Sequence, residues 1–113
     1  MTTQLLIVSA GSHRLALAVD QVEEIAERGV VTLLPGLPSA MAGVVAVRDR
    51  AIPLIDVAAL HGDAPRHDRR CVVVTNDGVR TLALLVDAVE QIADEAEFEM
   101  VLLDPRTLLE TLG

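Results

Sequence analysis

A segment that occurs twice constrains this chain more than any other feature. Residues 15–26 read LALAVDQVEEIA, and residues 82–93 read LALLVDAVEQIA. The same shift of 67 positions places the apolar run at 5–8 on the apolar run at 72–75. Each of these runs ends at a glycine-containing turn signal, where glycine can adopt a positive φ without a steric penalty. The sequence therefore predicts two copies of one unit, each of which begins with a β-hairpin.

The segment that follows each hairpin has the pattern Val-Asp-x-Val-Glu-x-Ile, which in the first copy covers residues 19–25. The spacing of its apolar residues fits a helix, but the segment also continues directly from a strand. A bent or bulged continuation of the strand fits equally well. The pattern leaves both alternatives open.

A third similarity links residues 54–60 to residues 102–108, now with a shift of 48 positions. In each case a short apolar strand runs into an aspartate, Asp56 or Asp104, which is a favoured N-cap residue. We expect short helices at 56–61 and at 105–112. Because this shift is smaller, the second copy lacks a counterpart of residues 29–50.

The spacing of short strands and turns predicts a mainly β fold built from small barrels. We expect one domain over residues 1–113, with a complete subdomain at about 5–62 and an abbreviated one at about 72–113. The polar residues 62–70 join them. A three-stranded remnant is marginal by itself, so the second subdomain must pack against the first.

Composition excludes several classes of function. A net charge of -8 argues against a nucleic-acid partner, because phosphate contacts need a surplus of Lys and Arg. Residues 29–47 are uncharged, but their Pro and Gly residues indicate a loop and a buried strand, so we expect no membrane insertion. The lone Cys71 and the absence of a basic, apolar leader favour the cytoplasm.

The polar residues do not form a pattern typical of catalysis. His13, His61 and His67 lack the spacing of metal ligands. Asp56 and Asp104 are explained as helix caps, and no glycine-rich phosphate loop or Ser-His-Asp set stands out. We therefore expect no catalytic residue, no cofactor and no metal, and the chain is predicted not to be an enzyme.

The central part of the chain resembles the CheW-like adaptor family of bacterial chemotaxis. The resemblance extends over almost the whole chain, including the Val-x-Glu-Ile segment of residues 22–25 and the terminal Leu-Leu-Asp of residues 102–104. The matching residues in the central segment are Leu34-Pro35, Pro38, Gly43-Val44, Arg48, Pro53, Ile55-Asp56 and Leu60.

The resemblance implies two SH3-like β-barrels on a common core and a non-catalytic coupling function. The implied partners are the tip of a chemoreceptor's cytoplasmic helical hairpin and the regulatory domain of a CheA-type histidine kinase. The receptor tip would dock in an apolar groove between the barrels, where Glu24 and Arg48 would form an ion pair. The residues expected to bind the receptor are Glu24, Ile25, Val44, Val45, Arg48 and Asp49. Strand alternation separates Val44 from Val45 but does not say which of them is exposed.

The chain departs from the family pattern at two places. Asp49 stands where the family has glycine, although aspartate tolerates tight turns. The long segment that precedes the last strand is reduced to about residues 90–99, as in the small FrzB-type adaptors. The shortened subdomain leaves kinase binding open. A self-associating structural or regulatory protein, with a homodimer formed through open β-edges, is the alternative function.

Overall fold

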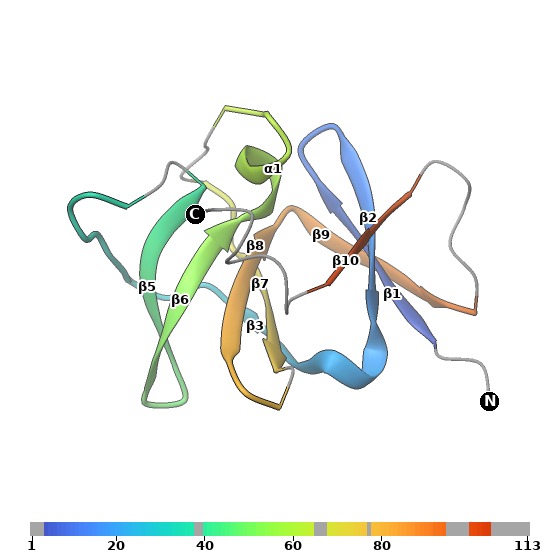
Figure 1. Ribbon diagram of the computed structural model, residues 1–113, viewed down its shortest axis with the longest axis horizontal. Helices are drawn as coiled ribbons and strands as arrows, with labels where there is room; N and C mark the ends of the chain where they lie inside the picture. The colour runs from blue at the N-terminus through green and yellow to red at the C-terminus, as the bar shows by residue number, and fades with distance from the viewer. Residues whose placement is uncertain (1–3, 38–39, 65–67, 77, 95–99, 105–113) are drawn as a thin grey trace.

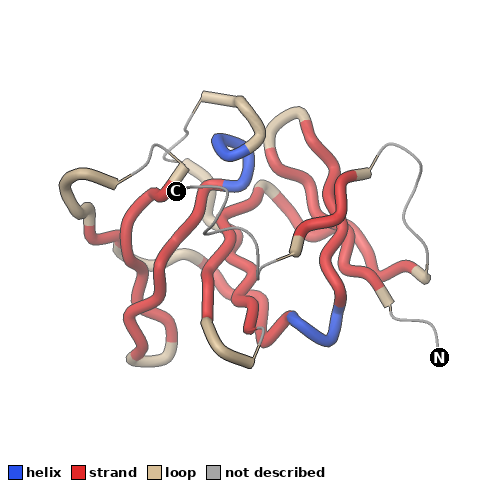
Figure 2. Tube along the Cα trace, viewed as in Figure 1, coloured by secondary structure: helices blue, strands red, loops and turns tan. Residues whose placement is uncertain are grey.

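The computed structural model describes residues 4–37, 40–64, 68–76, 78–94 and 100–104. Strands make up most of it, and two short helical segments interrupt them (Figure 2). The predicted helix at 105–112 lies outside the described residues. The elements are β1 (Leu5–Ala10), β2 (His13–Ala18), the 3-10 turn η1 (Val19–Gln21), β3 (Val22–Glu27), β4 (Val31–Thr32), β5 (Met41–Val47), β6 (Arg50–Asp56), α1 (Val57–Leu60), β7 (Cys71–Asn76), β8 (Thr81–Val86), β9 (Ala88–Ala93) and β10 (Val101–Leu103).

The strands form two sheets that lie side by side (Figure 1). Sheet A has the order β10-β2-β1-β9, and sheet B has the order β3-β7-β8-β6-β5-β4. The mainly β fold predicted from the sequence is confirmed. No helix in the described part of the chain is long and apolar enough to cross a membrane.

The two hairpins predicted from the repeat exchange their third strands. β1 and β2 pair with each other, and β1 then pairs with β9 from the second half of the chain. Reciprocally, β7 and β8 pair with each other, and β7 pairs with β3 from the first half. Each sheet therefore takes strands from both sequence copies. The predicted boundary between subdomains at residues 62–72 follows the sequence repeat but does not separate the sheets.

The two exchanged strands, β9 and β3, pair with β1 and β7 in corresponding registers. Ile92 of β9 is opposite Leu6, and Ile25 of β3 is opposite Val73, which is the same pair shifted by 67 positions. Both exchanged strands also carry a register irregularity at the corresponding place, so that Glu90 and Glu23 are each left without an opposite residue. The duplicated sequence thus encodes a duplicated backbone, including its bulge.

The closing strands, β6 and β10, are related by the second shift, of 48 positions. Leu103 of β10 is opposite Leu17, and Ile55 of β6 is opposite Leu84, with both pairs in parallel ladders. Beyond β6, Asp56 is the N-cap of α1, since its carboxylate accepts a hydrogen bond from the Ala59 N–H at 3.2 Å. The predicted cap and first helix are confirmed.

The ambiguous segment at 19–25 combines both alternatives. Its first three residues form η1, and the strand β3 begins at Val22. The 3-10 turn redirects the chain, so that β3 leaves its own hairpin and reaches β7. The apolar residues Val22 and Ile25 then fall on the strand rather than on a helix.

Two apolar cores hold these layers. The larger core lies between the sheets, and the smaller one lies on the other face of sheet B. The larger core contains Leu6, Val8, Ala10, Leu15, Leu17, Ile55, Val57, Ala58, Val73, Leu82, Leu84, Val86 and Leu103. The smaller core contains Val45, Val47, Ile52, Leu54, Val72, Val74, Ala83 and Leu85, and it is the interior of the first barrel.

A buried arginine connects three segments of the chain. The side chain of Arg69 is 3% exposed, and its Nε donates to the Asp87 Oδ1 at 2.7 Å. Its Nη1 lies 3.6 Å from the Oδ1 of the equally buried Asp56. The other carboxylate oxygen of Asp87 accepts a hydrogen bond from the Gly11 N–H in the β1–β2 turn. Arg69 belongs to the polar segment 62–70 that was expected to join the two subdomains, but its side chain is buried, where Asp87 and Asp56 compensate its charge.

Replacing this arginine is expected to destabilise the whole fold. In Arg69→Ala the carboxylate of Asp56 stays buried without a cation, and a broken buried pair costs about 3 kcal/mol or more. The matched control is Arg70→Ala, because Arg70 is exposed and its loss should change the free energy of unfolding by less than about 0.5 kcal/mol. Chemical denaturation of both variants measures the difference. Equal stability of the two variants would contradict the role given to Arg69.

Candidate functional site

The β5–β6 hairpin brings a predicted site residue against β3. The hairpin turns at Arg48 and Asp49, whose φ angles are 48° and 64°. A two-residue turn with positive φ at both positions matches the right-handed twist of the strands. Asp49 therefore serves in the place of the family's glycine, as expected. The turn presents the Arg48 guanidinium to Glu24, and the Arg48 Nε donates to the two carboxylate oxygens at 2.8 and 3.0 Å.

A second ion pair runs beside the first. Arg50, at the start of β6, donates from its Nη2 to the Glu23 carboxylate. β3 is the edge of sheet B, whereas Arg48 lies in the turn, and Arg50 directly after the turn, of a hairpin at the other side of the same sheet. We call the line where these two sides meet the barrel seam, defined by the pairs Glu24–Arg48 and Glu23–Arg50. The seam pairs close the first barrel with side chains rather than with a backbone ladder.

The seam changes the proton affinity of its members. The hydrogen bond from Arg50 lowers the pKa of Glu23 below the ordinary value of a glutamate. The hydrogen bonds to Glu24 and Glu23 raise the pKa of Arg48 and the pKa of Arg50, respectively. Each of these three shifts favours the charged form of the side chain, as expected for ion-paired groups.

The other predicted site residues are unequally exposed. Ile25 follows Glu24 on β3, and its side chain is 49% exposed although it lies at the margin of the core between the sheets. Val44 is half-buried, and Val45 is completely buried in the core of the first barrel. Val45 is therefore a core residue and has no surface to offer a partner. Val44 lies on the opposite face of β5, outside the core of the first barrel.

A groove of about 410 Å³ lies beside the C-terminal end of β3, near Asp87, where the chain passes from β8 into β9. Its lining residues are Ala26, Glu27, Arg70, Cys71 and Asp87. Three of these five residues, Glu27, Arg70 and Asp87, are charged, so this groove is not apolar. Burial raises the pKa of the Cys71 thiol, which keeps it in the protonated and unreactive form.

Sequence reasoning missed an exposed apolar group near the β4 strand. Val30, Leu33 and Leu34 have large exposed fractions although they lie in the uncharged segment read as a loop and a buried strand. It also missed the Glu23–Arg50 pair. The available signal was the doublet Glu23-Glu24 together with two arginines, Arg48 in the hairpin turn and Arg50 directly after it.

The histidines and acidic residues do not assemble a metal centre within the described residues, where no group of three His, Cys, Asp or Glu side chains is placed to hold an ion. His13 and His61 lie with ring centroids 5.4 Å apart, and the His13 Nε2 is 3.6 Å from the Asp63 Oδ1. Asp63 accepts hydrogen bonds from the Ser12 N–H and hydroxyl, which lower the pKa of Asp63. This cluster fastens the β1–β2 turn to the segment after α1.

The seam predicts a pH dependence at acidic pH. Because the pKa of Glu23 is lowered in the folded state, the pair with Arg50 stabilises the fold above the ordinary glutamate pKa. This contribution is lost as the pH falls through the lowered value. A carbon-detected NMR titration should show the Glu23 carboxyl titrating lower in the wild type than in Arg50→Met. The same pKa in both proteins would contradict the pair.

Comparison with known proteins shows similarity to one protein family. Residues 4–109 match the CheW-like domain family. A Rhizobium etli protein with the name "Probable chemotaxis protein CheW" is 31% identical over 91 residues, which are 79% of this chain and 59% of that protein. The chain thus spans about three fifths of the length of this relative.

A solved structure agrees with this match at the level of the fold. The scaffolding protein TtCheW of Thermoanaerobacter tengcongensis superimposes with a TM-score of 0.73 at 24% identity, over 86% of this chain and 68% of TtCheW. Two sheets with exchanged strands, a hairpin turn at Arg48 and a match over residues 4–109 lead to one conclusion. The chain belongs to the CheW-like domain family.

Proposed function

We propose that this chain is a cytoplasmic, non-catalytic adaptor that couples a chemoreceptor to a CheA-type histidine kinase pathway. The observation that carries the proposal is the Glu24–Arg48 pair on the barrel seam beside the exposed Ile25. These are the residues that the family resemblance assigns to the receptor. The names of the similar proteins, a chemotaxis protein and a scaffolding protein, support the same function.

The geometry suits a helical partner. Ile25 offers an apolar anchor on an edge strand, and Val44 adds a half-buried apolar surface. Amphipathic helices dock on such surfaces through a few apolar anchors. We assign the docking face for the receptor's helical hairpin to Glu24, Ile25, Val44, Arg48 and Asp49.

Arg48 can pair with Glu24 and donate hydrogen bonds to a partner at the same time. Its Nε is used by Glu24, but the side chain as a whole is 78% exposed. The planar guanidinium therefore presents its outer donors to solvent, where a carboxylate or a helix C-terminus of a partner can accept them. Charged pairs at such a rim contribute more to specificity and to the association rate than to affinity.

Exchanging the charges of the Glu24–Arg48 pair distinguishes a direct contact of Arg48 with the receptor from a role of Arg48 only in closing the barrel seam. Arg48→Glu should weaken binding of the receptor's cytoplasmic fragment at least tenfold, since the guanidinium is lost and two carboxylates face each other. The double variant Glu24→Arg/Arg48→Glu restores an ion pair across the seam with the charges exchanged. We expect it to regain thermal stability without regaining receptor affinity, as measured by calorimetric titration.

The control for this experiment is Arg80→Glu, which makes the same change of charge at an exposed position in the β7–β8 turn. It should bind the receptor fragment like the wild type. If the double variant binds as tightly as the wild type, the seam pair acts only on the fold and Arg48 does not contact the receptor.

The abbreviated second copy suggests a division between the two partners. Sheet B carries the β5–β6 hairpin and six strands, whereas sheet A has four strands among the residues that the structure describes. We infer that the chain binds the receptor well and the kinase poorly. A kinase domain that recognises a complete second barrel would find only part of that binding surface on this chain.

Parallel titrations test this division. The chain is titrated with the receptor fragment and, separately, with the regulatory domain of the kinase, and a full-length adaptor of the family serves as the reference. We expect affinity for the receptor comparable to that of the reference and affinity for the kinase at least tenfold lower. Kinase affinity equal to that of the reference would refute the division and leave the receptor result intact.

A further inference from the structure

The bulge in β3 directs two consecutive glutamates to one face of sheet B. Residues that lie opposite each other in an antiparallel pair point to the same face. Val22 is opposite Thr75 and Glu24 is opposite Val74, which leaves Glu23 without an opposite residue. Because Thr75 and Val74 are consecutive residues of a strand, they point to opposite faces. Val22 and Glu24 therefore point to opposite faces as well, although they are two positions apart.

Both glutamates consequently point toward the first barrel. Glu24 shares its face with Val74, which belongs to the core of that barrel. Val22 packs against the core between the sheets, and strand alternation turns Glu23 away from that core. A regular strand would direct one glutamate to each face. The bulge thus brings two carboxylates to the barrel seam, in the way that bulges redirect side chains in other sheets.

The β5–β6 hairpin presents two arginines to these carboxylates. Arg50 is opposite Val47, whose side chain lies in the core of the first barrel, so Arg50 also points to the barrel side. Its Nη2 donates to the Glu23 Oε2, while the Arg48 Nε donates to both carboxylate oxygens of Glu24 at 2.8 and 3.0 Å. Two cations thus meet two carboxylates from adjacent residues. A different distribution of the same charges would pair Arg50 with Glu24.

The four charges act on one another across the seam. The hydrogen bond to Glu23 is the largest cause of the raised pKa of Arg50, and the charge of Glu24 raises this pKa further. The charge of Arg48 lowers it. Arg50 is therefore attracted by both glutamates and repelled by the other arginine. Without the Glu23 carboxylate, both arginines would compete for Glu24.

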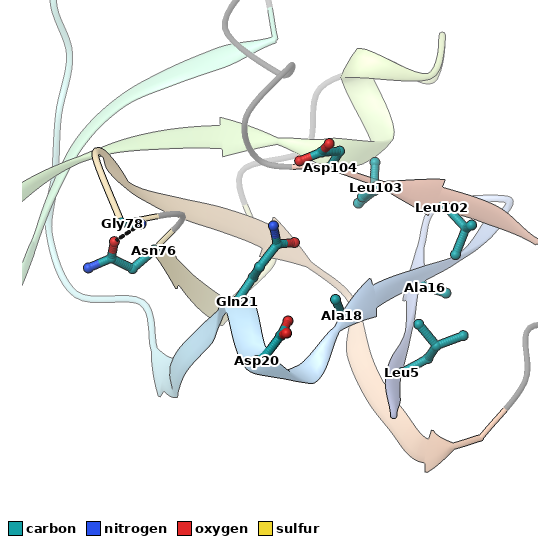
Figure 3. Close-up of a pocket in the computed structure, with 10 residues that line it drawn as sticks. All are labelled: Leu5, Ala16, Ala18, Asp20, Gln21, Asn76, Gly78, Leu102, Leu103 and Asp104. Atoms are coloured by element: carbon teal, nitrogen blue, oxygen red, sulfur yellow. Dashed lines mark hydrogen bonds between the residues drawn. The ribbon is translucent and has the colours of Figure 1, made fainter. Parts of the chain in front are cut away.

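Asn76, the last residue of β7, is a second donor to Glu23. Its side chain lines a pocket of about 720 Å³ together with Gly78, whose N–H donates to the Asn76 Oδ1 at 2.8 Å (Figure 3). A carboxylate only accepts hydrogen bonds, so the amide nitrogen of Asn76 donates to Glu23. This hydrogen bond lowers the pKa of Glu23, after the larger effect of the bond from Arg50. Two donors thus hold Glu23, and neither belongs to the docking face.

The two arginines differ in what they offer a partner. The Arg48 side chain is 78% exposed, and its contact with the 19% exposed Glu24 uses the Nε, which leaves the terminal nitrogens for a partner. The Arg50 side chain is 43% exposed and uses a terminal nitrogen for Glu23. Pairing of Glu24 with Arg50 would release Arg48 from the contact that orients its guanidinium at the docking face.

The second copy contains the same bulge without this competition. Glu90 is its bulge residue and accepts a hydrogen bond from the Arg14 Nε at 3.0 Å. The exposed fractions, 35% for Glu90 and 42% for Arg14, match the 35% and 43% of Glu23 and Arg50. The next residue is Gln91, which carries no charge. The second copy thus has a matching pair of glutamate and arginine, with no second carboxylate at the following position.

We propose that Glu23 is a positioning residue for the docking face. By binding Arg50, it leaves Glu24 to pair with Arg48, so that the Arg48 guanidinium is oriented toward the receptor. Glu23 acts through these side chains and makes no contact with the receptor itself. The receptor part of this inference rests on the proposed adaptor function, whereas the distribution of partners within the seam is a property of the protein alone.

NMR measures the distribution of partners on the protein alone. An Nε–H bound to a carboxylate exchanges slowly with water, so the exchange rate of the Arg48 Nε–H reports its pairing with Glu24. We expect Glu23→Gln to raise this rate at least fivefold, because Arg50 then competes for Glu24. The double variant Glu23→Gln/Arg50→Met removes the competitor and should return the rate to within twofold of the wild-type value. An unchanged rate in Glu23→Gln, or no return in the double variant, would overturn the proposal.

Calorimetric titration with the receptor's cytoplasmic fragment gives the functional readout. Glu23→Gln should weaken binding at least fivefold, and the double variant should bind within twofold of the wild type. If Glu23 only helped to close the barrel, the double variant would bind no better than Glu23→Gln, because both lack the Glu23–Arg50 pair, and this result would refute a positioning role. If the wild type does not bind the fragment, the proposed adaptor function fails, while the exchange rates still decide how the seam charges are paired.

Glu90→Gln is the matched control, because it removes an equally exposed carboxylate from the second copy. It should leave the Arg48 Nε–H exchange rate and the receptor affinity at their wild-type values. The thermal unfolding midpoints of Glu90→Gln and Glu23→Gln should fall by similar, small amounts, since partly exposed ion pairs contribute little to stability. An effect of Glu90→Gln on Arg48 as large as that of Glu23→Gln would exclude a specific role of Glu23.

Discussion

The exchange of one strand between two hairpins is the constraint from which the rest of this structure follows. A hairpin of two strands does not have enough buried surface to be stable in water. Here each hairpin receives its third strand from the other copy, β9 for the first and β3 for the second. Neither sheet can therefore form until both halves of the chain are in place. The core between the sheets, which takes residues from both, makes them one cooperative unit.

The same constraint positions the candidate docking face. β3 is an edge strand because it has left its own hairpin, and the edge leaves Ile25 exposed beside the groove. The β5–β6 hairpin then reaches across the open side of the barrel and delivers Arg48 to Glu24. Neither residue would meet the other if β3 had remained with β1 and β2.

Local structure was predictable from the sequence to a large extent, and long-range pairing was not. The hairpins, the Asp56 cap and the turn at Asp49 each depend on a few neighbouring residues. The exchange of third strands does not depend on neighbouring residues alone. Ile25 would lie opposite an apolar residue whether β3 paired with β1, at Leu6, or with β7, at Val73. Two residues are more buried than the sequence suggested. Arg69 lies in a polar linker but is buried beside carboxylates from distant segments, and Val45, which the family resemblance assigned to the receptor site, lies in the core of the first barrel.

The two copies differ at the positions that form the proposed docking face in the first. Gln91 and Ile92 repeat the positions of Glu24 and Ile25, and Ile92 is also exposed on an edge strand. The second copy nevertheless has no carboxylate at the first of these positions, and residues 94–100 contain no basic residue to pair with it. The duplicated strands thus repeat the backbone, and the β5–β6 hairpin of the first copy supplies the arginines of the proposed docking face.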